Sequence, residues 1–591
     1  MFRKKFLFTL ALTLWGSTAI GALQLVSVKD EIALGRQAQQ EVRRQVPELR
    51  DIERISVERQ SAWELEAIRQ DSAGDAITVD GQSQDLTLAD RRVGEVTRPF
   101  DIHGRQRHRF LSGPRQCDRN DHKADGDQGD EKDDPVSPSG RHRGHPTTRA
   151  AIRGAYKCHP ADRLRWRAMK PTTAVLGAGA LGLTVALRLS QRGERVTVAE
   201  REPLPGGLAA GFEIEPRMWL EKFYHHLFRS DRRAIAMIDE LGLSDQLEWK
   251  QPVTATLRDG KFHQLDSPAS LLRFSPLSVA DRLRMGAVLA ALKAMPNPRL
   301  LEGQTAAEWL QRWMGPNGYG VVWEPLLRGK FGAAAPEIAM PWFWARVHDR
   351  TQALGYVRGG FQQLYDRMAE RVREAGGETR FGVSVKSVTR SDGGFLVETD
   401  EGSERFDRVI STFAPRLTAR LVPELPEEWR AKHEWGRAYG AHCLILALDR
   451  PLTSVYWLNV NDPGYPFMAL VEHTNYMPAS DYGGRHLIYL GNYRSMDDPL
   501  MTAPKETVLE EFLPHLARLN PVFERSWVTD SWMFAAPFAQ PIVTVDYRDH
   551  IPPFETPIPN LWTASMFQVY PHDRGQNYSI DLANRLVEHL F

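Results

Sequence analysis

The stretch that most constrains this chain is residues 172–208, which reads TTAVLGAGALGLTVALRLSQRGERVTVAEREPLPGGL. A short apolar run at 174–176 is followed by glycines at 177, 179 and 182, which form a G-x-G-x-x-G pattern. Apolar residues then recur at helical spacing over 183–189, and a second apolar run, 196–198, ends at Glu200. This order predicts a strand, a tight turn, a helix and a second strand, as in a dinucleotide-binding unit.

Each residue of the motif has a physical task in such a unit. Gly177 permits the tight turn, Gly179 lets the backbone approach a pyrophosphate, and Gly182 lets the helix pack closely on the strand. The helix begins near Ala180, and its free N–H groups and positive dipole end suit the phosphates. Glu200 follows about 20 residues later, where an acid accepts hydrogen bonds from a ribose hydroxyl pair. A glycine-rich loop in another kind of α/β protein is the alternative, but it leaves Glu200 unexplained.

A second pair of glycines follows this unit. Arg201 and a short loop lead to Gly206-Gly207-Leu208, where the backbone can pass close to the ribityl and pyrophosphate groups of a flavin cofactor. With these residues, the segment resembles the N-terminus of the superfamily of flavin-dependent amine oxidases, protoporphyrinogen oxidases and phytoene desaturases. Many relatives carry Arg after the diglycine. Leu208 at that position favours the desaturase-like branch.

Two later segments extend the resemblance over nearly all of 169–591. Gly359-Gly360-Phe361 precedes an amphipathic helix, a strand pattern and a hairpin through residues 391–394. In the superfamily this block returns to the flavin domain, and the backbone around the residue matching Val385 holds the adenine. Residues 560–565 then predict a strand and 575–590 a helix. The resemblance implies that this unit contacts the flavin through Ser565, Asp573, Arg574, Gly575 and Asn577. The sequence departs from the family at Met566, where relatives often carry an acidic residue nearby.

The expected fold class is therefore α/β. A Rossmann-like FAD-binding domain of the glutathione-reductase-like type is assigned residues 169–215, 350–415 and 555–591. An inserted α+β substrate domain is assigned 216–349 and 416–554. FAD is expected to bind noncovalently, because no C-terminal cysteine is placed for covalent attachment, and Cys443 lies in an apolar run typical of a core strand.

The inserted segments mix aromatic and basic residues, as a dry pocket against a flavin would require. Catalytic candidates are His225, His226, Lys330 and Tyr356: a histidine could act as base, and Lys330 could hold a water. Further candidates for the pocket are Tyr224, Arg346 and Arg358, the arginines as clamps for an anionic substrate. For each of these residues the alternative is a structural hydrogen bond or a solvated charge.

Three functions remain open at this point. The first is an FAD-dependent oxidoreductase that removes a hydride from a C–H bond beside nitrogen or conjugated carbon and passes the electrons to an unidentified acceptor. The second is a non-redox flavoenzyme resembling UDP-galactopyranose mutase, acting on a sugar nucleotide. The third is a binding protein that keeps the fold without chemistry. The expected partner is a small-molecule substrate. With 75 basic and 75 acidic residues, the chain has no net charge that would indicate nucleic-acid binding.

The first 168 residues differ from the rest. Residues 1–22 combine a basic start with an apolar run, which predicts a signal peptide or membrane anchor and thus export or membrane association. Residues 1–50 resemble the start of envelope zinc metallopeptidases, but the chain has no H-E-x-x-H motif, so a protease is excluded. Residues 23–168 lack apolar periodicity and are predicted to be largely disordered. One hypothesis is that this region is not native and that Met169 is the true start, which would make the enzyme cytoplasmic or peripherally bound to a membrane.

Overall fold

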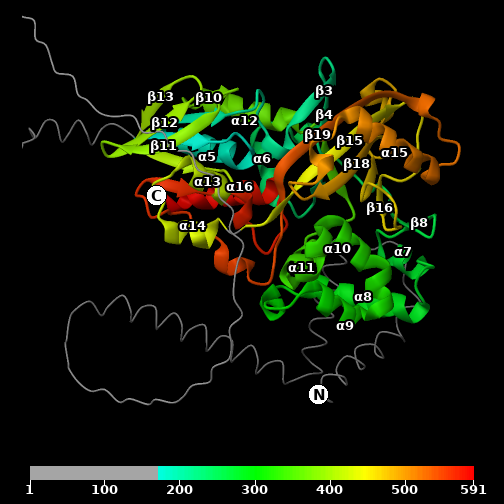
Figure 1. The fold of residues 1–591 in the computed structure, drawn as a ribbon. Helices are drawn as coiled ribbons and strands as arrows, with labels where there is room; N and C mark the ends of the chain where they lie inside the picture. Colours follow the sequence, from blue (N-terminus) through cyan, green and yellow to red (C-terminus); the bar gives the residue numbers. More distant parts are fainter. Residues whose placement is uncertain (1–170, 435) are drawn as a thin grey trace, which may run out of the picture. The chain divides into compact units, whose positions relative to one another are not determined.

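The computed structural model describes residues 171–434 and 436–591. The predicted signal peptide or anchor, the predicted disordered region 23–168 and Met169 lie outside the described residues. The first sheet of the described part has five strands in the order β10-β2-β1-β14-β20, and every neighbouring pair is parallel (Figure 1). Its strands are β1 (Thr172–Leu176), β2 (Arg195–Glu200), β10 (Glu378–Phe381), β14 (Arg408–Ser411) and β20 (Leu561–Thr563).

The alternation of side chains along β1 gives this sheet two different covers. Val175 belongs to a core shared with helices α5 (Ala180–Gln191), α12 (Gln362–Glu374) and α16 (Gln576–His589). Ala174 and Leu176 point to the opposite face and join a second core with an antiparallel sheet. That sheet consists of β11 (Val385–Ser391), β12 (Gly394–Thr399) and β13 (Ser403–Phe406). The result is three layers: helices, parallel sheet and antiparallel sheet.

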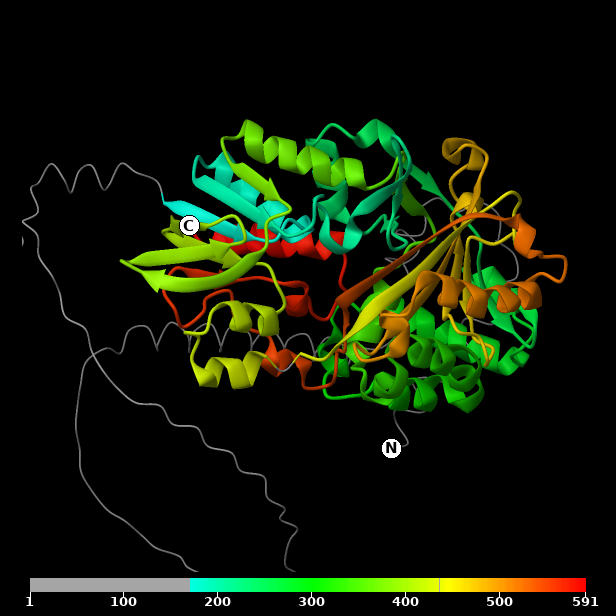
Figure 2. The ribbon, with the colours of Figure 1, turned by 45° about the horizontal axis from the view of Figure 1, so that its top comes forward.

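A second large sheet has seven strands in the order β19-β15-β18-β17-β16-β7-β8, antiparallel except for the parallel pair β16 and β7. Figure 2 shows helix α15 (Lys505–Leu519), in orange, beside its long strands. Leu444 and Leu446 pack into the core with α15, whereas Cys443 and Ile445 face the first core. The strands are β7 (Thr254–Arg258), β8 (Lys261–Gln264), β15 (Ala438–Leu448), β16 (Trp457–Val460), β17 (Ala469–Glu472), β18 (His486–Arg494) and β19 (Val528–Pro541).

A group of helices forms a separate core built from Trp342, Phe343, Leu310 and their neighbours. Its members are α7 (Pro268–Arg273), α8 (Val279–Ala294), α9 (Ala306–Gly318), α10 (Glu324–Phe331) and α11 (Met340–His348). The remaining elements are the hairpin β3 (Gly211–Glu215) and β4 (Met218–Glu221), the small sheet of β5 (Leu227–Phe228), β9 (Leu354–Val357) and β6 (Leu247–Lys250), and helices α6 (Arg232–Glu240), α13 (Pro415–Leu421) and α14 (Glu427–His433).

Helix α6 crosses the domain division expected from the sequence. It lies within the range 216–349 assigned to substrate binding, yet Ala234, Met237 and Ile238 pack into the same core as α5 and α16. An ion pair of 2.9 Å between Arg233 and Asp581 joins it to α16. The division into two domains stays a prediction, and α6 belongs by packing to the layer of helices.

The elements expected from periodicity are present. The predicted strand at 174–176, the helix at 183–189 and the strand at 196–198 correspond to β1, α5 and β2, and the hairpin through 391–394 joins β11 to β12. The C-terminal strand and helix are β20 and α16. No helix within the described residues is long and apolar enough to cross a membrane.

Candidate functional site

The turn between β1 and α5 shows why glycine is needed at two of its positions. Gly177 has a φ of +103°, which side chains other than glycine rarely adopt. A β-carbon added at Gly182 would lie 2.0 Å from the carbonyl oxygen of Gly177, far inside van der Waals contact. The close packing of α5 on the end of β1 therefore depends on the absence of a side chain at Gly182.

The two glycine motifs of the sequence meet at this turn. The N–H of Gly206 donates to the carbonyl oxygen of Ala178 at 2.8 Å, and Gly179 and Gly206 form a parallel bridge. A β-carbon on Gly207 would lie 3.3 Å from the Cα of Gly179, whereas one on Gly179 would meet nothing within 4 Å. Gly179 is also the N-cap of α5 and provides no side-chain cap. The start of α5 thus presents backbone N–H groups to open space, as a pyrophosphate requires.

Glu200 ends β2 beside this turn. Its carboxylate accepts hydrogen bonds from the N–H groups of Ala178 and Glu202, at 2.8 and 2.9 Å. The N–H of Val383 donates to the backbone carbonyl of Glu200 at 2.8 Å, so the chain that leads into Val385 at the start of β11 runs past the same edge. Segments nearly 200 residues apart therefore converge where the adenosine half of a dinucleotide would bind.

The other predicted cofactor residues of the first segment lie around this edge. Leu208 sits in a short 3-10 turn, Gly207–Ala209, directly after the second glycine motif. The Arg201 side chain is exposed and pairs with Glu202 at 3.0 Å. Its role as a cofactor contact stays a prediction.

The C-terminal unit reaches the same sheet from the other side. The N–H of Ala564 donates to the carbonyl of Ser411 at 3.0 Å, and the N–H of Ser565 donates to the side chain of Gln568 at 2.5 Å. Gly575 is the N-cap of α16 and has no side-chain cap. The Asn577 side-chain oxygen accepts from the N–H groups of Arg233 and Ala234, at 2.9 and 3.3 Å. This oxygen caps the start of α6, so the structure gives it a packing role instead of leaving it free for a cofactor.

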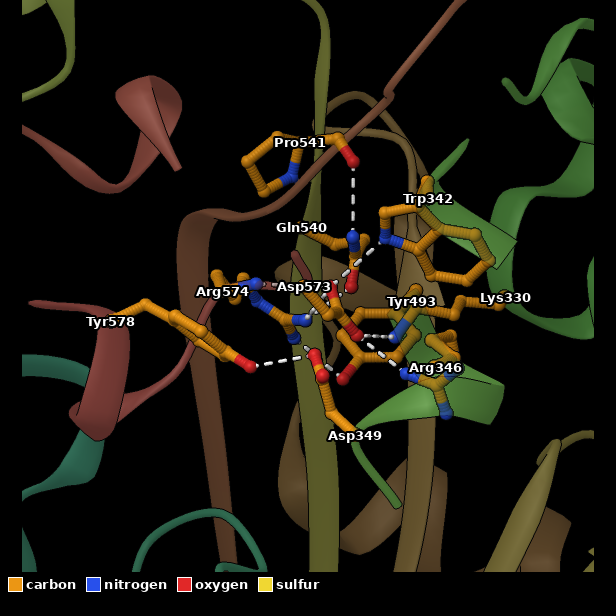
Figure 3. Close-up of polar contacts among 10 residues, drawn as sticks. All are labelled: Lys330, Trp342, Arg346, Asp349, Tyr493, Gln540, Pro541, Asp573, Arg574 and Tyr578. Atoms are coloured by element: carbon orange, nitrogen blue, oxygen red, sulfur yellow. Dashed lines mark hydrogen bonds and ion pairs between the residues drawn. The ribbon is translucent and has the colours of Figure 1, made fainter. Parts of the chain in front are cut away.

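Figure 3 shows a cluster of cations gathered around one carboxylate, Asp573. Lys330 from α10 donates to Asp573 Oδ2 at 3.2 Å, and Arg346 from α11 donates to the same atom at 2.5 Å. The indole N–H of Trp342 reaches Oδ1 at 3.3 Å. Arg574 pairs with Oδ1 at 3.5 Å. The helical group thus meets the loop that precedes α16 through this carboxylate.

The ionisation of this cluster follows from burial and from its excess of cations. Burial alone would raise the pKa of Asp573, but the charges of Lys330, Arg346 and Arg574 hold the pKa well below its usual range. Burial lowers the pKa of Lys330 well below its ordinary value; Asp573 opposes this shift, and the two guanidinium groups add to it. Asp573 is therefore ionised, while Lys330 is an amine that can lose its proton more readily than a surface lysine.

Further polar residues hold the loop around Asp573 in place. Arg574 donates to the Tyr493 hydroxyl at 2.7 Å and also binds the Gln540 side chain. Asp349, just beyond α11, accepts from His572 at 2.6 Å and from the Tyr578 hydroxyl at 2.7 Å. Although burial opposes it, these bonds and one from His348 lower the pKa of Asp349 to about 2.

The two predicted histidines lie close to the cluster but are not free bases. Burial lowers the pKa of His225 to about 4, against a hydrogen bond to the Phe223 carbonyl at 2.6 Å. Burial also lowers the pKa of His226 to about 3, with Arg350, His225 and Arg346 adding to the shift. His226 contacts the Tyr456 hydroxyl at 3.2 Å. Both rings are neutral at physiological pH.

Tyr356 lies apart from this group, and its catalytic role stays a prediction. It is fully buried in β9, and its hydroxyl donates to Glu221 at 2.8 Å. The same carboxylate accepts the N–H of Phe361 at 2.7 Å, at the end of the Gly359-Gly360 turn. Arg358 is also elsewhere, since its exposed side chain pairs with Glu248. Tyr356 is a core residue because Glu221 and its aromatic neighbours enclose it.

Several residues of the site carry no signal in the sequence. Asp349, Tyr493 and Gln540 stand outside any recognisable motif. Each bonds to a residue of the C-terminal segment 34 to 229 positions away. Within the described residues, no cluster of His, Cys, Asp and Glu is arranged to hold a metal ion.

Comparison with known proteins then identifies the family. Residues 182–572 match the family model described as flavin-containing amine oxidoreductase. The chain belongs to this family. The matched range covers about two thirds of the chain, and the open turn at Gly179, the uncapped start of α5 and the acceptor Glu200 fit its cofactor, FAD.

Curated relatives and solved structures agree with this placement. The carotenoid phi-ring synthase of Streptomyces griseus is 27% identical over 46% of this chain and 59% of its own length. The 15-cis-phytoene desaturase of Arabidopsis thaliana is 30% identical over 45% of this chain and 51% of its own length. The alignments thus span little more than half the length of these relatives.

Among solved structures, the fold is similar to a putative protoporphyrinogen oxidase from Exiguobacterium sp., with a TM-score of 0.58 at 18% identity over 71% of this chain and 99% of the other. It is similar to reduced UDP-galactopyranose mutase, with a TM-score of 0.58 at 17% identity over 71% of this chain and 95% of the other. At these identities the structural likeness shows the fold alone.

Proposed function

We propose that the protein removes a hydride from a C–H bond of an organic substrate and passes the electrons to a second acceptor. The layer of helices, parallel sheet and antiparallel sheet would be its Rossmann-like FAD-binding domain, of the glutathione-reductase-like type. The seven-stranded sheet and the helical group around α10 and α11 would form the substrate domain. The convergence of Gly179, Glu200 and the segment before Val385 on one edge of the parallel sheet supports this division.

The proposed FAD site follows the backbone described above. Gly177, Gly179, Gly182 and the start of α5 at Ala180 would hold the pyrophosphate, and Glu200 the ribose. The remaining contacts are assigned to Arg201, Gly206, Gly207, Leu208, Val385, Ser565, Asp573, Arg574, Gly575 and Asn577. For Asn577 only the side-chain nitrogen remains available, because its oxygen caps α6.

The observation that carries the proposed chemistry is the buried lysine in the cluster around Asp573. Bound FAD would supply a hydride acceptor. The Lys330 amine, with its pKa lowered by burial, would hold a water or accept a proton at Nζ. Asp573 and the ring of Trp342, which lies 5.5 Å from the ammonium, would fix its position. His225 and His226 would line the same space as neutral rings.

The charge of the cluster indicates the kind of substrate. Lys330, Arg346 and Arg574 share Asp573 as their carboxylate, so the cluster is net positive even when Lys330 is neutral. A cationic amine would be repelled there. A C–H bond beside conjugated carbon fits better, in agreement with relatives named as a carotenoid phi-ring synthase and a phytoene desaturase.

The same positive charge also supports a second candidate function, that of a non-redox enzyme resembling UDP-galactopyranose mutase. Arginines beside a flavin would suit an anionic sugar nucleotide, and a mutase shares the fold. Such an enzyme would turn over only after prior reduction of its flavin and would use no net electrons.

The experiment is an anaerobic screen in which the flavin absorbance near the visible maximum of the purified protein is followed. We expect neutral or anionic conjugated compounds to bleach the flavin and putrescine not to do so. Lys330→Met should slow the bleaching by about a hundredfold, the usual contribution of a positioned acid or base. Arg328→Gln, on the exposed face of the same helix, is the matched control. Bleaching by amines alone would contradict the proposal.

A further inference from the structure

Arg346 lies in the last turn of α11, and Arg350 lies two residues beyond the end of this helix. Their positive charges are only partly balanced by neighbouring carboxylates. Arg346 bonds through Nη1 to Asp573, which it shares with Lys330 and Arg574. In the part of the chain that the structure describes, the guanidinium of Arg350 has no hydrogen-bond or ion-pair partner. Its contact is with the ring of Phe228, whose centroid lies 5.8 Å from the guanidinium carbon.

The His226 ring connects the two arginines. It is 5.2 Å from the Phe228 ring that Arg350 contacts, and both guanidinium groups lower the pKa of His226, after the larger effect of its burial. The guanidinium of Arg350 is protonated at neutral pH. The carboxylate nearest in sequence, Asp349, already accepts bonds from His348, His572 and Tyr578. Arg350 is accessible to solvent, so a ligand can reach the unmatched charge.

A row of aromatic rings extends from the Phe228 ring that Arg350 contacts. The His226 ring lies 5.2 Å from Phe228 and 5.9 Å from Trp457, both edge-on. Tyr224 makes a further edge contact with Trp457, at 4.9 Å. A ligand with a flat apolar body and one charged end would match both surfaces, since rings bind flat groups well and guanidinium binds carboxylate or phosphate through paired hydrogen bonds.

We propose that Arg346 and Arg350 form a subsite for an anionic group, a carboxylate or a phosphate, at one end of a conjugated substrate. The proposal rests on the proposed function, because it names the substrate class of the same site. Arg350 is the determinant of this specificity, because its charge has no other partner. Arg346 would contact the ligand while it also pairs with Asp573.

The test measures binding to the FAD-loaded full chain, without turnover, by calorimetric titration. The probes share one conjugated body and differ at the end: retinoic acid, retinyl phosphate, retinol and retinylamine. We expect one or both acids to bind at least about tenfold more tightly than retinol, the effect of a charge-assisted hydrogen-bond pair. Which acid binds more tightly separates carboxylate from phosphate. Equal binding of retinol and both acids would overturn the proposal.

Variants and a change of salt concentration test whether Arg350 causes the preference for acids. Arg350→Gln should remove most of the preference for acids and leave retinol binding unchanged, whereas Arg328→Gln, an exposed arginine paired with Glu324, should behave as the parent. Raising the salt from about 0.05 M to about 0.5 M should also weaken the preference in the parent protein. An unchanged preference in Arg350→Gln, or one insensitive to salt, would refute the subsite. Acid-selective binding without any bleaching of the flavin would support the subsite and contradict the proposed redox function.

Discussion

At the scale of single residues, Glu200 connects the first sheet to the cofactor. Its carboxylate binds the N–H groups of Ala178 and Glu202 and is assigned the ribose. Glu200→Ala should weaken FAD binding by roughly ten- to a hundredfold, as expected for the loss of hydrogen bonds to a charged group. Fluorescence titration of the apoprotein with FAD measures this. Unchanged affinity in Glu200→Ala would argue against the cofactor assignment.

The ionisation of Glu221, in the core, should make the stability of the protein depend on pH. Burial raises the pKa of Glu221 from 4.5 to about 7, against hydrogen bonds from the Phe361 N–H and the Tyr356 hydroxyl. Between about pH 4 and pH 7, Glu221 therefore keeps its proton in the native state, whereas the unfolded chain has already released it. This contribution to stability is complete at the lower pH and is lost as the pH rises through 7.

Replacing Glu221 by Gln should accordingly reduce the fall in the free energy of unfolding between pH 5 and pH 8 by up to about 3 kcal/mol. Glutamine can still accept the Phe361 N–H. Urea unfolding of parent and variant at several pH values measures the difference. The pKa of Glu472 is also raised, to about 7, mainly by burial, so part of the pH dependence should remain. An identical pH dependence in Glu221→Gln would show that Glu221 is ionised in the native state.

At the scale of elements, the packing of α5 on β1 depends on Gly182. A β-carbon there would lie 2.0 Å from the Gly177 carbonyl, so Gly182→Ala must push the helix away. We expect a loss of about 1–3 kcal/mol in the free energy of unfolding together with weaker FAD binding. Gly286→Ala, in α8, is the matched control, because its β-carbon would make only an ordinary contact of 3.6 Å. Equal stability of the two variants would contradict this account.

The elements were predictable where one local period decides them. Short apolar runs predict β1 and β2, the 3.6-residue period predicts α5 and α12, and the glycines of 177–182 predict the turn. Helix α6 shows the limit. Its place against α16 depends on Asn577 and Asp581, more than 340 residues away.

The site was predictable only in part, because its residues also depend on partners that are distant in the chain. Lys330 and Arg346 stood out by residue type, whereas Asp573 and Arg574 were assigned to the cofactor through a resemblance. Tyr356 looked equally suitable, and only its burial against Glu221 shows that it belongs to the core. Local sequence does not encode which distant carboxylate a side chain meets.

At the scale of the whole molecule, the described residues form four apolar cores. We expect a chain that starts at Met169 to fold, take up FAD in equimolar amount and unfold at the same temperature as the full chain. Cofactor content and calorimetry of the two chains measure this. A shortened chain that fails to bind FAD while the full chain binds it would contradict the expectation.

If the protein uses its flavin to oxidise a substrate, counting electrons under anaerobic conditions will show it. FAD-loaded protein is mixed with a conjugated acid that it binds, and reduced flavin and product are both quantified. We expect one flavin to be reduced for each product molecule formed, with oxidised flavin as the active starting form. Product formed only after prior reduction of the flavin, with no change in its redox state, would contradict it and identify a mutase-like enzyme.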